Sequence, residues 1–403
     1  MDIKASKNIN LLLLTAVVGV FSVNILVVMI GPLLVDIARD LDVSIALAGQ
    51  LAGFMAIPWL IVGVASGPIS DTYGRKPVLL TGLGLGILGA IGTSFAWNFI
   101  SAIIFRALSG MAGVVPTNVT AVVSDYIPVK GRGRALGYIT FGAGLGGVIG
   151  VPLMTVLADF TSWRWSFLIA SFIEIGAWIL FVIVIPKSRN LKRSDQNLFS
   201  KFKPLLRQRI IWDLTLINIF QRTGLAILLT YFASYLIIEH NFSTAQTSIP
   251  ISIVSGGMIL ASVIGGFLAD TRYRMILGPF ALVLSGIFGF SIFAIKFDPI
   301  SEIGLGFFYA ASAFSLFPII ATLFSIIGGN SFRGTALGML PISNQFGSTI
   351  GPAFAGIALS LGGFPAIGVV CLILGIVGSV CAPFLLKESR VTQASKSLAV
   401  YKE

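Results

Sequence analysis

Two short stretches of the chain, which begin 199 residues apart, decide its fold. Residues 67–77 read GPISDTYGRKP and residues 266–275 read GFLADTRYRM. Four residues of the first stretch recur at equivalent positions in the second, as Gly67 and Gly266, Asp71 and Asp270, Thr72 and Thr271, and Arg75 and Arg274. A second repeat has an offset of 201 residues. The segment RGRALG, which begins at Arg132, recurs as RGTALG, which begins at Arg333. Two nearly equal offsets indicate that a unit of half the chain was duplicated.

The composition around these stretches excludes a soluble globular protein. Of 403 residues, 56% are hydrophobic and only 11% are charged, whereas soluble domains carry about 25% charged residues. A membrane-spanning helix needs about 20 apolar residues to cross the hydrocarbon core. The chain therefore has room for about a dozen spans with short connections and for almost no extramembrane domain.

Apolar runs separated by charged, glycine, proline or asparagine clusters predict twelve spans. Their boundaries are 11–35, 45–69, 78–95, 99–123, 135–157, 165–185, 210–237, 249–269, 275–295, 303–327, 336–360 and 364–386. The predicted organisation is a six-helix bundle at 1–186, a basic linker at 187–209, a second six-helix bundle at 210–386 and a tail at 387–403. Six is an even number, so both halves enter the membrane from the same side. The predicted fold is an all-α membrane protein of two parallel six-helix repeats with a shared cavity between them.

The distribution of basic residues predicts the orientation, because cytoplasmic loops retain an excess of Lys and Arg. Of the 27 basic residues, 22 fall on the side that holds the N-terminus, and only Arg39, Arg164 and Lys296 fall on the opposite side. Arg106 and Arg222 lie within spans. We expect a multi-pass protein of the cell membrane with both termini in the cytoplasm.

Three motifs resemble known sequence elements of the major facilitator superfamily. The loop after the second span contains Gly67, Asp71, Gly74, Arg75 and Lys76, and resembles the signature G-x-x-x-D-x-x-G-R-K of that superfamily. In span 4, the residues Arg106, Gly110 and Gly113 are similar to the R-x-x-x-G-x-x-G element of proton-linked members, with Ser109 where glutamine is common. In span 5, the helix-packing candidates Gly142, Gly146 and Gly150 are similar to the antiporter element, although Gly147 replaces its proline and Val151 its last glycine. The group that the chain resembles is the twelve-span drug:proton antiporters.

The resemblance implies a conformational latch at the signature loop. Asp71 is expected to meet the start of span 11, and Arg75 to pair with Asp125 at the end of span 4, in a bond that forms facing outward and breaks facing inward. In the second copy Asp270 and Arg274 persist, but Tyr273 replaces the glycine and no carboxylate ends span 10. We therefore expect a weaker latch there. A helix N-terminus also favours a nearby anion on physical grounds, whereas a plain loop charge is the alternative.

Ionisable residues inside a bilayer are costly, so each is a candidate functional residue. Arg106, Glu174 and Asp36 are the proton-coupling candidates; Glu174 is the only carboxylate near the middle of a span. The alternative for Glu174 is a residue outside the cavity, because span 6 is peripheral in the superfamily. The alternative for Asp36 is a charge at the level of the lipid headgroups.

Polar side chains within the spans are the substrate-cavity candidates. Asn218 and Arg222 are four residues apart and share one helix face. The full set is Asn24, Gln50, Asn118, Asn218, Gln221, Arg222, Asn344 and Gln345. Each could instead make a hydrogen bond between helices, which is worth about 0.6 kcal/mol. With 31 phenylalanines in the chain, such a cavity favours a lipophilic or amphipathic solute that is neutral or anionic.

These features predict a secondary active transporter that exports a small organic solute. The resemblance implies multidrug efflux by proton antiport. The alternative is an exporter or facilitator of a sugar, a nucleoside or an amino acid. The segments around Pro152 and Trp163 resemble those of related bacterial sugar and nucleoside exporters. An enzyme is excluded because no span contains a histidine or a cluster of carboxylates. We expect no cofactor, no metal site and no nucleic-acid partner, a monomer, and His240 as a solvated residue of an outer loop. Cys371 and Cys381 are expected to be packing residues.

Overall fold

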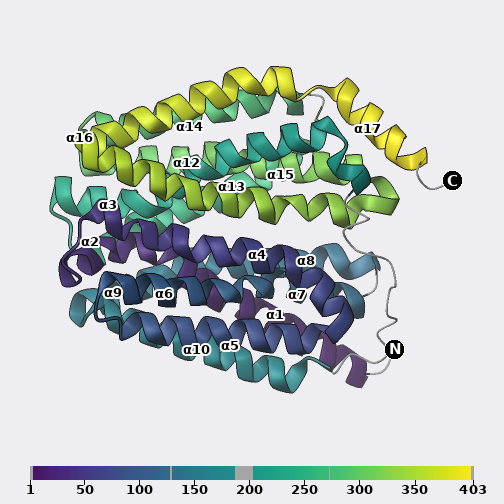
Figure 1. Ribbon diagram of the computed structural model, residues 1–403, viewed down its shortest axis with the longest axis horizontal. Coiled ribbons are helices and arrows are strands. Elements are labelled where there is room, and N and C mark those ends of the chain that lie inside the picture. Colours follow the sequence, from purple (N-terminus) through teal and green to yellow (C-terminus); the bar gives the residue numbers. More distant parts are fainter. Residues whose placement is uncertain (1–2, 128, 187–202, 272, 401–403) are drawn as a thin grey trace. The chain divides into compact units, whose positions relative to one another are not determined.

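The computed structural model describes residues 3–127, 129–186, 203–271 and 273–400, and within these ranges the regular structure is helical (Figure 1). The helices of the first half are α1 (Ile3–Val28), α2 (Ile30–Asp40), α3 (Ile45–Ala48), α4 (Gln50–Tyr73), α5 (Arg75–Ser94), α6 (Phe99–Ser109), η1 (Gly110–Gly113), α7 (Val114–Tyr126), α8 (Val129–Leu145), η2 (Gly146–Gly150), α9 (Val151–Phe160) and α10 (Trp163–Val184). Those of the second half are α12 (Arg209–His240), η3 (Ala245–Thr247), α13 (Ser248–Ala269), α14 (Arg274–Ala294), α15 (Pro299–Leu337), α16 (Met339–Leu385) and α17 (Glu388–Val400). Most of the predicted linker, residues 187–202, lies outside the described residues.

Eleven helical segments of the described chain are long and apolar enough to cross a membrane. The last of them, Thr335–Leu385, has 51 residues and is twice the length of a normal span. Gly362 and Gly363 interrupt it, and Gly363 has a φ of 68°, which a residue with a side chain rarely adopts. Division at this break gives the twelve membrane helices that the sequence predicts.

The described chain separates into two compact units. The first contains α1 to α10 together with Asn241–Ser252, and the second contains α12, the remainder of α13, and α14 to α17. In the first unit α5 packs against α6 and α10, and α1 packs against α8 and α10. In the second unit α16 packs against α12 and α14. The sequence places Asn241–Ser252 in the second half, whereas in the structure this segment packs with the first.

Within each unit, helices pack closely against one another at glycine residues. Lipid is as apolar as leucine, so helices associate in a membrane through packing and hydrogen bonds rather than through the hydrophobic effect. In the first unit, a Cβ added at Gly89 of α5 would lie 2.2 Å from the backbone nitrogen of Ser109. In the second unit, a Cβ at Gly375 of α16 would lie 2.7 Å from Cα of Gly286 of α14. A larger side chain at these positions would force the helices apart.

The duplication extends to the local geometry of the turns. Asp42 and Asn241, 199 residues apart, are the two non-glycine residues with positive φ in the described chain, at 51° and 55°. Aspartate and asparagine tolerate this left-handed conformation better than other residues. Two residues later, Ser44 Oγ accepts a hydrogen bond from the Leu47 nitrogen at 3.1 Å, and Ser243 Oγ accepts one from the Gln246 nitrogen at 3.3 Å. The two turns are therefore equivalent although their sequences differ.

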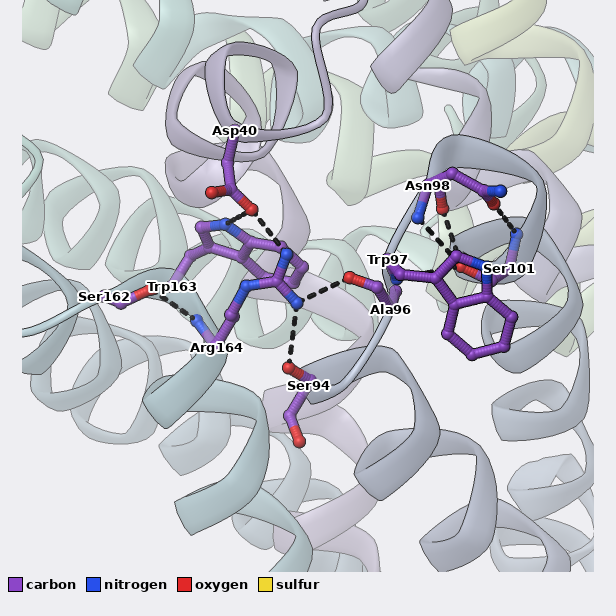
Figure 2. A network of polar contacts seen from close by, with 9 residues as sticks. All are labelled: Asp40, Ser94, Ala96, Trp97, Asn98, Ser101, Ser162, Trp163 and Arg164. Carbon is purple, nitrogen blue, oxygen red and sulfur yellow. Dashed lines mark hydrogen bonds and ion pairs between the residues drawn. The ribbon is translucent and has the colours of Figure 1, made fainter.

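A second pair of equivalent turns precedes α6 and α15. Asn98 Oδ1 accepts a hydrogen bond from the Ser101 nitrogen at 2.8 Å, as Figure 2 shows. Asp298 Oδ2 accepts one from the Ser301 nitrogen at 3.0 Å, 200 residues further on. Both are helix N-caps, which satisfy backbone donors that have no partner within the helix. The hydrogen bonds from Ser301 lower the pKa of the Asp298 carboxyl, so this cap keeps its charge under all but acidic conditions.

Candidate functional site

The signature loop joins α4 to α5 through a glycine in the left-handed region. Gly74 has a φ of 99°, and this conformation ends α4 and lets α5 begin at Arg75. Arg75 Nη2 lies 2.9 Å from Asp71 Oδ1, and Arg75 Nε lies 3.4 Å from Asp125 Oδ2. Arg75 Nη1 also donates to Ser70 Oγ at 2.6 Å. The pair of Arg75 and Asp125 that the resemblance implies is thus present in the first unit.

These ion pairs are easily broken, because both carboxylates are half-exposed. The side chains of Asp71 and Asp125 are 47% and 53% exposed. Exposed ion pairs typically contribute about 0.2–1 kcal/mol. Such a small free energy means that these contacts contribute little to the stability of the fold.

The second copy of the loop obtains its carboxylate from the C-terminal helix. Arg274 pairs with Glu388 of α17, with Nε donating to Oε2 at 3.3 Å and Nη2 lying close to Oε1. Arg274 Nη1 also donates to the Ala269 carbonyl at 3.4 Å. The sequence shows no carboxylate at the end of span 10, and the repeat alone could not reveal a partner 114 residues away. A weaker latch at Asp270 and Arg274 remains a prediction.

The tail beyond span 12 contains a helix that is docked on the second unit. Val391, Ala394 and Leu398 of α17 are buried in the same apolar cluster as the core of that unit. Arg390 Nη1 donates to Asp213 Oδ2 of α12 at 3.2 Å. The tail is therefore anchored on its apolar face and by charge, which the composition of residues 387–403 does not indicate.

Arg106 of α6 and Glu174 of α10 are fully buried in the first unit. Arg106 Nη1 donates to the Leu26 carbonyl at 3.2 Å, and its guanidinium lies 5.5 Å from the centre of the Phe167 ring. Its Nε and Nη2 atoms, and both carboxyl oxygens of Glu174, have no hydrogen-bond partner. The two groups are close enough to interact electrostatically without a direct contact. Glu174 is thus buried within the first unit, and its role in proton coupling stays a prediction.

Glycines bring span 4 against span 2 next to this buried pair. Gly110 begins the 3₁₀ turn η1, and a Cβ there would lie 2.3 Å from the Met55 carbonyl oxygen of α4. A Cβ at Gly113 would lie 2.5 Å from the Trp59 ring. Arg106 is thus a buried cation, and the two glycines that follow it lie where the chain packs closely against α4.

The glycines of span 5 lie against α1. A Cβ at Gly142 would lie 2.8 Å from Val17, one at Gly146 3.2 Å from Asn24, and one at Gly150 2.4 Å from Ile25. Gly146–Gly150 form a π-helical turn between α8 and α9. Such turns are frequent at functional sites. The span is thus both closely packed and locally irregular.

The polar residues of the first unit differ in their surroundings. Asn24 Nδ2 donates to the Ala143 carbonyl of α8 at 2.6 Å, which is the hydrogen bond between helices that the alternative reading offers. Asn118 Nδ2 donates to the Val114 carbonyl at 2.9 Å, while its Oδ1 is buried without a partner. Gln50 Nε2 donates to the Ala46 carbonyl at 3.3 Å. Asn118 therefore has one buried acceptor that no described residue satisfies.

The polar residues of the second unit gather between α12 and α16. Asn218 Nδ2 donates to Ser343 Oγ at 2.6 Å and to Asn344 Oδ1 at 2.9 Å. Gln221 is 2% exposed, and neither polar atom of its side chain has a hydrogen-bond partner. Gln345 is half-buried one residue further along α16. Buried amides are usually hydrogen-bonded, so Gln221 stands out among these residues.

Arg222 adds a cation to this group. Its guanidinium lies 5.8 Å from the centres of the Phe314 and Phe317 rings of α15, and its Nε is buried without a hydrogen-bond partner. A Cβ at Gly347 of α16 would lie 2.6 Å from Cβ of Arg222, so the glycine admits the arginine between the helices. The structure thus places a cation, two aromatic rings and the amide of Gln221 on neighbouring helices.

Asp36 contacts the segment that follows α12. Thr244 Oγ1 donates to Asp36 Oδ2 at 2.7 Å, and Ser243 Oγ donates to Asp159 Oδ2 at 3.3 Å. Ser252 Oγ donates to the Val148 carbonyl at 3.0 Å. Asp36 therefore fastens a loop within the first unit, a role that its position at the end of an apolar run could not reveal.

Figure 2 shows a polar network that joins three connections of the first unit. Arg164 Nη2 lies 2.6 Å from Asp40 Oδ2, and Arg164 Nη1 donates to the carbonyls of Ser94 at 3.1 Å and Ala96 at 2.6 Å. Trp163 Nε1 donates to the same Asp40 oxygen at 3.2 Å. Arg164, one of the few basic residues predicted on the outer side, thereby ties the ends of α2, α5 and α10 together.

The expectation of a solvated His240 is wrong. His240 is the last residue of α12, and its side chain is only 7% exposed. Its Nε2 lies 2.5 Å from Oε2 of Glu302, a residue of α15 that is fully buried. Glu302 could not be recognised from the sequence, because it lies near the end of an apolar run and resembles an ordinary loop residue. Among the described residues no group of three or more His, Cys, Asp or Glu could hold a metal ion.

Comparison with known proteins agrees with this architecture. Residues 14–327 match the model of the Major Facilitator Superfamily. The chain is 27% identical over 96% of its length to the uncharacterized MFS-type transporter YwfA of Bacillus subtilis, of which it covers 95%. It is 28% identical over 88% of its length to multidrug resistance protein 1 of the same organism, of which it covers 91%. The crystal structure of a D-xylose-proton symporter shares the fold, with a TM-score of 0.76, 19% identity, and coverage of 94% of this chain and 97% of the other.

Proposed function

The chain belongs to the major facilitator superfamily, whose members transport small molecules across membranes, and we propose that it exports a lipophilic or amphipathic solute by proton antiport. It would lie in the cell membrane as a monomer with both termini in the cytoplasm. Transport would proceed by alternating access, with two similar halves that rock around a central site. Such a protein is a transporter rather than an enzyme.

The group around Arg222 is the observation that carries this proposal. A half-buried guanidinium beside two phenylalanine rings can bind a solute that combines an apolar body with an anionic or strongly polar end. The unsatisfied amide of Gln221 supplies both a donor and an acceptor for the same solute. The described part of the second unit offers Arg222 no carboxylate partner within ion-pair distance, so an anionic ligand could provide the missing charge.

Arg106 and Glu174 support proton coupling. A carboxyl group whose oxygens have no hydrogen-bond partner can bind a proton without losing an interaction. The nearby guanidinium favours release of that proton when the two groups approach, because an opposite charge stabilises the ionised carboxylate. A change in their separation during the cycle would therefore load and unload a proton.

The signature loop would control the conformational change. The contacts of Arg75 with Asp71 and Asp125 are weak enough to break in each cycle. We propose that they hold one arrangement of the halves until solute or proton binds. Asp270 and Arg274 would act in the same way in the second half, with Glu388 in place of Asp125.

Transport in proteoliposomes under an imposed pH gradient tests the proposal. The panel should contain an amphipathic anion, an amphipathic cation, a sugar and a nucleoside, because these separate the proposed substrate class from its rivals. We expect gradient-driven movement of the amphipathic anion, loss of that movement in Arg222→Gln, and loss of the pH dependence in Glu174→Gln. Transport of the sugar or nucleoside alone would contradict the proposed substrate class. Undiminished pH-driven transport by Glu174→Gln would contradict the coupling.

A second candidate function is export of a sugar, a nucleoside or an amino acid. The linked amide and hydroxyl groups of Asn218, Ser343 and Asn344 favour it, because hydroxylated solutes are recognised by such groups. The same panel decides between the two candidates. In that case Asn218→Ala should impair transport more than Arg222→Gln does.

A further inference from the structure

A buried acid and the single histidine of the chain meet where α12 ends and α15 begins. His240 Nε2 lies 2.5 Å from Glu302 Oε2. The other carboxyl oxygen, Oε1, accepts hydrogen bonds from the Tyr235 hydroxyl at 2.7 Å and from the Phe297 nitrogen at 3.1 Å. Glu302 is fully buried, and the side chain of His240 is nearly so. Both carboxyl oxygens therefore have donors, and one of these donors is a histidine.

The surroundings of this pair are mostly apolar. The Tyr235 ring packs edge-on against His240, Phe293 of α14 and Phe364 of α16, with ring centres 5.2–5.8 Å apart. The other charged groups nearby are exposed or already partnered. Glu239 Oε2 lies 3.3 Å from Lys296 Nζ, and Asp298 accepts hydrogen bonds from Ser301 as the cap of α15.

The repeat shows that the fold does not require these charges. The turn that follows His240 begins with Asn241, and its equivalent in the first half begins with Asp42, after Leu41. Glu302 lies four residues after Asp298, the cap of α15. Ala102 lies four residues after Asn98, the equivalent cap of α6. The same corner is thus built with leucine and alanine in one half and with histidine and glutamate in the other. At this corner, a buried acid and a buried base, which are costly, occur only in the second half.

We propose that His240 and Glu302 form a proton-binding site that fastens the end of α12 to the start of α15. Histidine is the side chain whose charge ordinarily changes between about pH 5 and 8. With its second proton bound, His240 forms an ion pair with Glu302, and the contact is strongest. When that proton is released to water as the pH rises, the ion pair is lost, and at most a hydrogen bond from the neutral imidazole to the carboxylate remains. The contact weakens as a result.

The site lies where the chain passes from the second unit into a segment of the first. His240 is the last residue of the second unit before the chain passes into Asn241–Ser252, which packs with the first unit. The site therefore anchors one end of the connecting segment that holds hydrogen bonds to Asp36 and Asp159. The distribution of basic residues between the loops predicts that the turn after α12 faces the outside of the cell. The site would then respond to the pH outside the cell, where a proton-driven exporter takes up its protons.

The inference is independent of the proposed substrate, and it can be tested on the purified protein without any solute. Because the chain contains one histidine, labelling of histidine with ¹⁵N and ¹³C followed by purification through a tag without histidine gives signals from His240 alone. We expect its imidazole signals to change between about pH 5 and 8 as the second proton is lost. At pH 6 the signals of Glu302→Gln should differ from those of the natural protein, because the imidazole no longer has its carboxylate partner. Signals that do not change with pH, or that are the same in Glu302→Gln at pH 6, would overturn the proposal.

A second measurement uses the corner of the first half as a design. The double variant His240→Leu with Glu302→Ala copies Leu41 and Ala102, so it should fold. We subtract the unfolding temperature of this variant from that of the natural protein. We expect this difference to be larger at pH 6 than at pH 8. Glu239→Gln, which breaks the exposed pair with Lys296, is the matched control and should keep the pH dependence of the natural protein. An equal difference at both pH values would refute the site, whatever the transport assay shows about solutes.

Discussion

The buried pair of Arg106 and Glu174 allows a quantitative prediction. Three variants are compared with the natural protein: Glu174→Leu, Arg106→Met and the combination of both. Each single change leaves one buried group without its opposite charge. Because a buried charge without a nearby opposite charge is costly, we expect each single variant to be destabilised. The combination leaves no buried charge and should be much less destabilised than the sum of the two.

The size of the coupling follows from the geometry. Two unit charges 4 Å apart interact by about 4 kcal/mol at an effective dielectric constant of 20. The carboxyl oxygens of Glu174 have no hydrogen-bond partner, so this pair is separated by more than hydrogen-bond distance. The Leu26 carbonyl and the Phe167 ring also stabilise the guanidinium on their own. We therefore expect a coupling free energy of about 1–3 kcal/mol, below the value for direct contact.

Reversible unfolding in mixed detergent micelles at pH 8 gives the free energy of unfolding of all four proteins. The double-mutant cycle isolates the coupling from the packing changes that each substitution brings. A coupling below about 0.5 kcal/mol, within the range of additive behaviour, would refute the reasoning. It would mean that the two groups do not carry opposite charges in the resting protein.

Further predictions concern packing, the polar network, the tail and the latch. Gly89→Ala should lower the free energy of unfolding by about 1–3 kcal/mol through overpacking, whereas Gly176→Ala, with nothing within 4 Å of the added carbon, should have little effect in the same detergent unfolding assay. Arg164→Lys should lower it by about 1 kcal/mol, because an ammonium cannot serve the separate acceptors that the guanidinium reaches. Glu388→Gln should cost about 0.2–1 kcal/mol at low salt and nothing at 1 M salt, as expected of an exposed ion pair. Asp71→Asn should reduce transport while the amount of inserted protein stays constant; full transport activity would argue against the latch.

Membrane helices could be predicted closely because hydropathy is a local property. The predicted span 78–95 corresponds to Arg75–Ser94, and 275–295 corresponds to Arg274–Ala294. The twelfth helix also required no structure, since Gly362 and Gly363 interrupt the apolar run where the sequence predicts a turn. The duplication was detectable wherever residues were identical, as at Asp71 and Asp270. It was hidden at Asp42 and Asn241, where the backbone repeats but the side chains differ.

The partners of charged residues could not be predicted from the sequence. Glu388 reaches Arg274 only because α17 folds back on its unit, and no periodic pattern encodes that contact. Glu174 could be recognised as unusual by its position in an apolar run, but only helix rotation decides whether it faces inward or outward. The polar residues that follow His240 predict a loop at this position, although His240 is the last residue of α12. In each case the missing information is the orientation of a helix face, which depends on packing between distant segments.

The segment Asn241–Ser252 has a practical consequence for dissecting the protein. The basic linker is the obvious place to cut the gene into two fragments, yet an N-terminal fragment made in this way would lack a piece of its own folded unit. Asp36 and Asp159 would lose the hydroxyl groups that they bind, and the surface left bare would invite aggregation. Co-expression of both fragments, rather than separate production, is the route by which a split version should assemble.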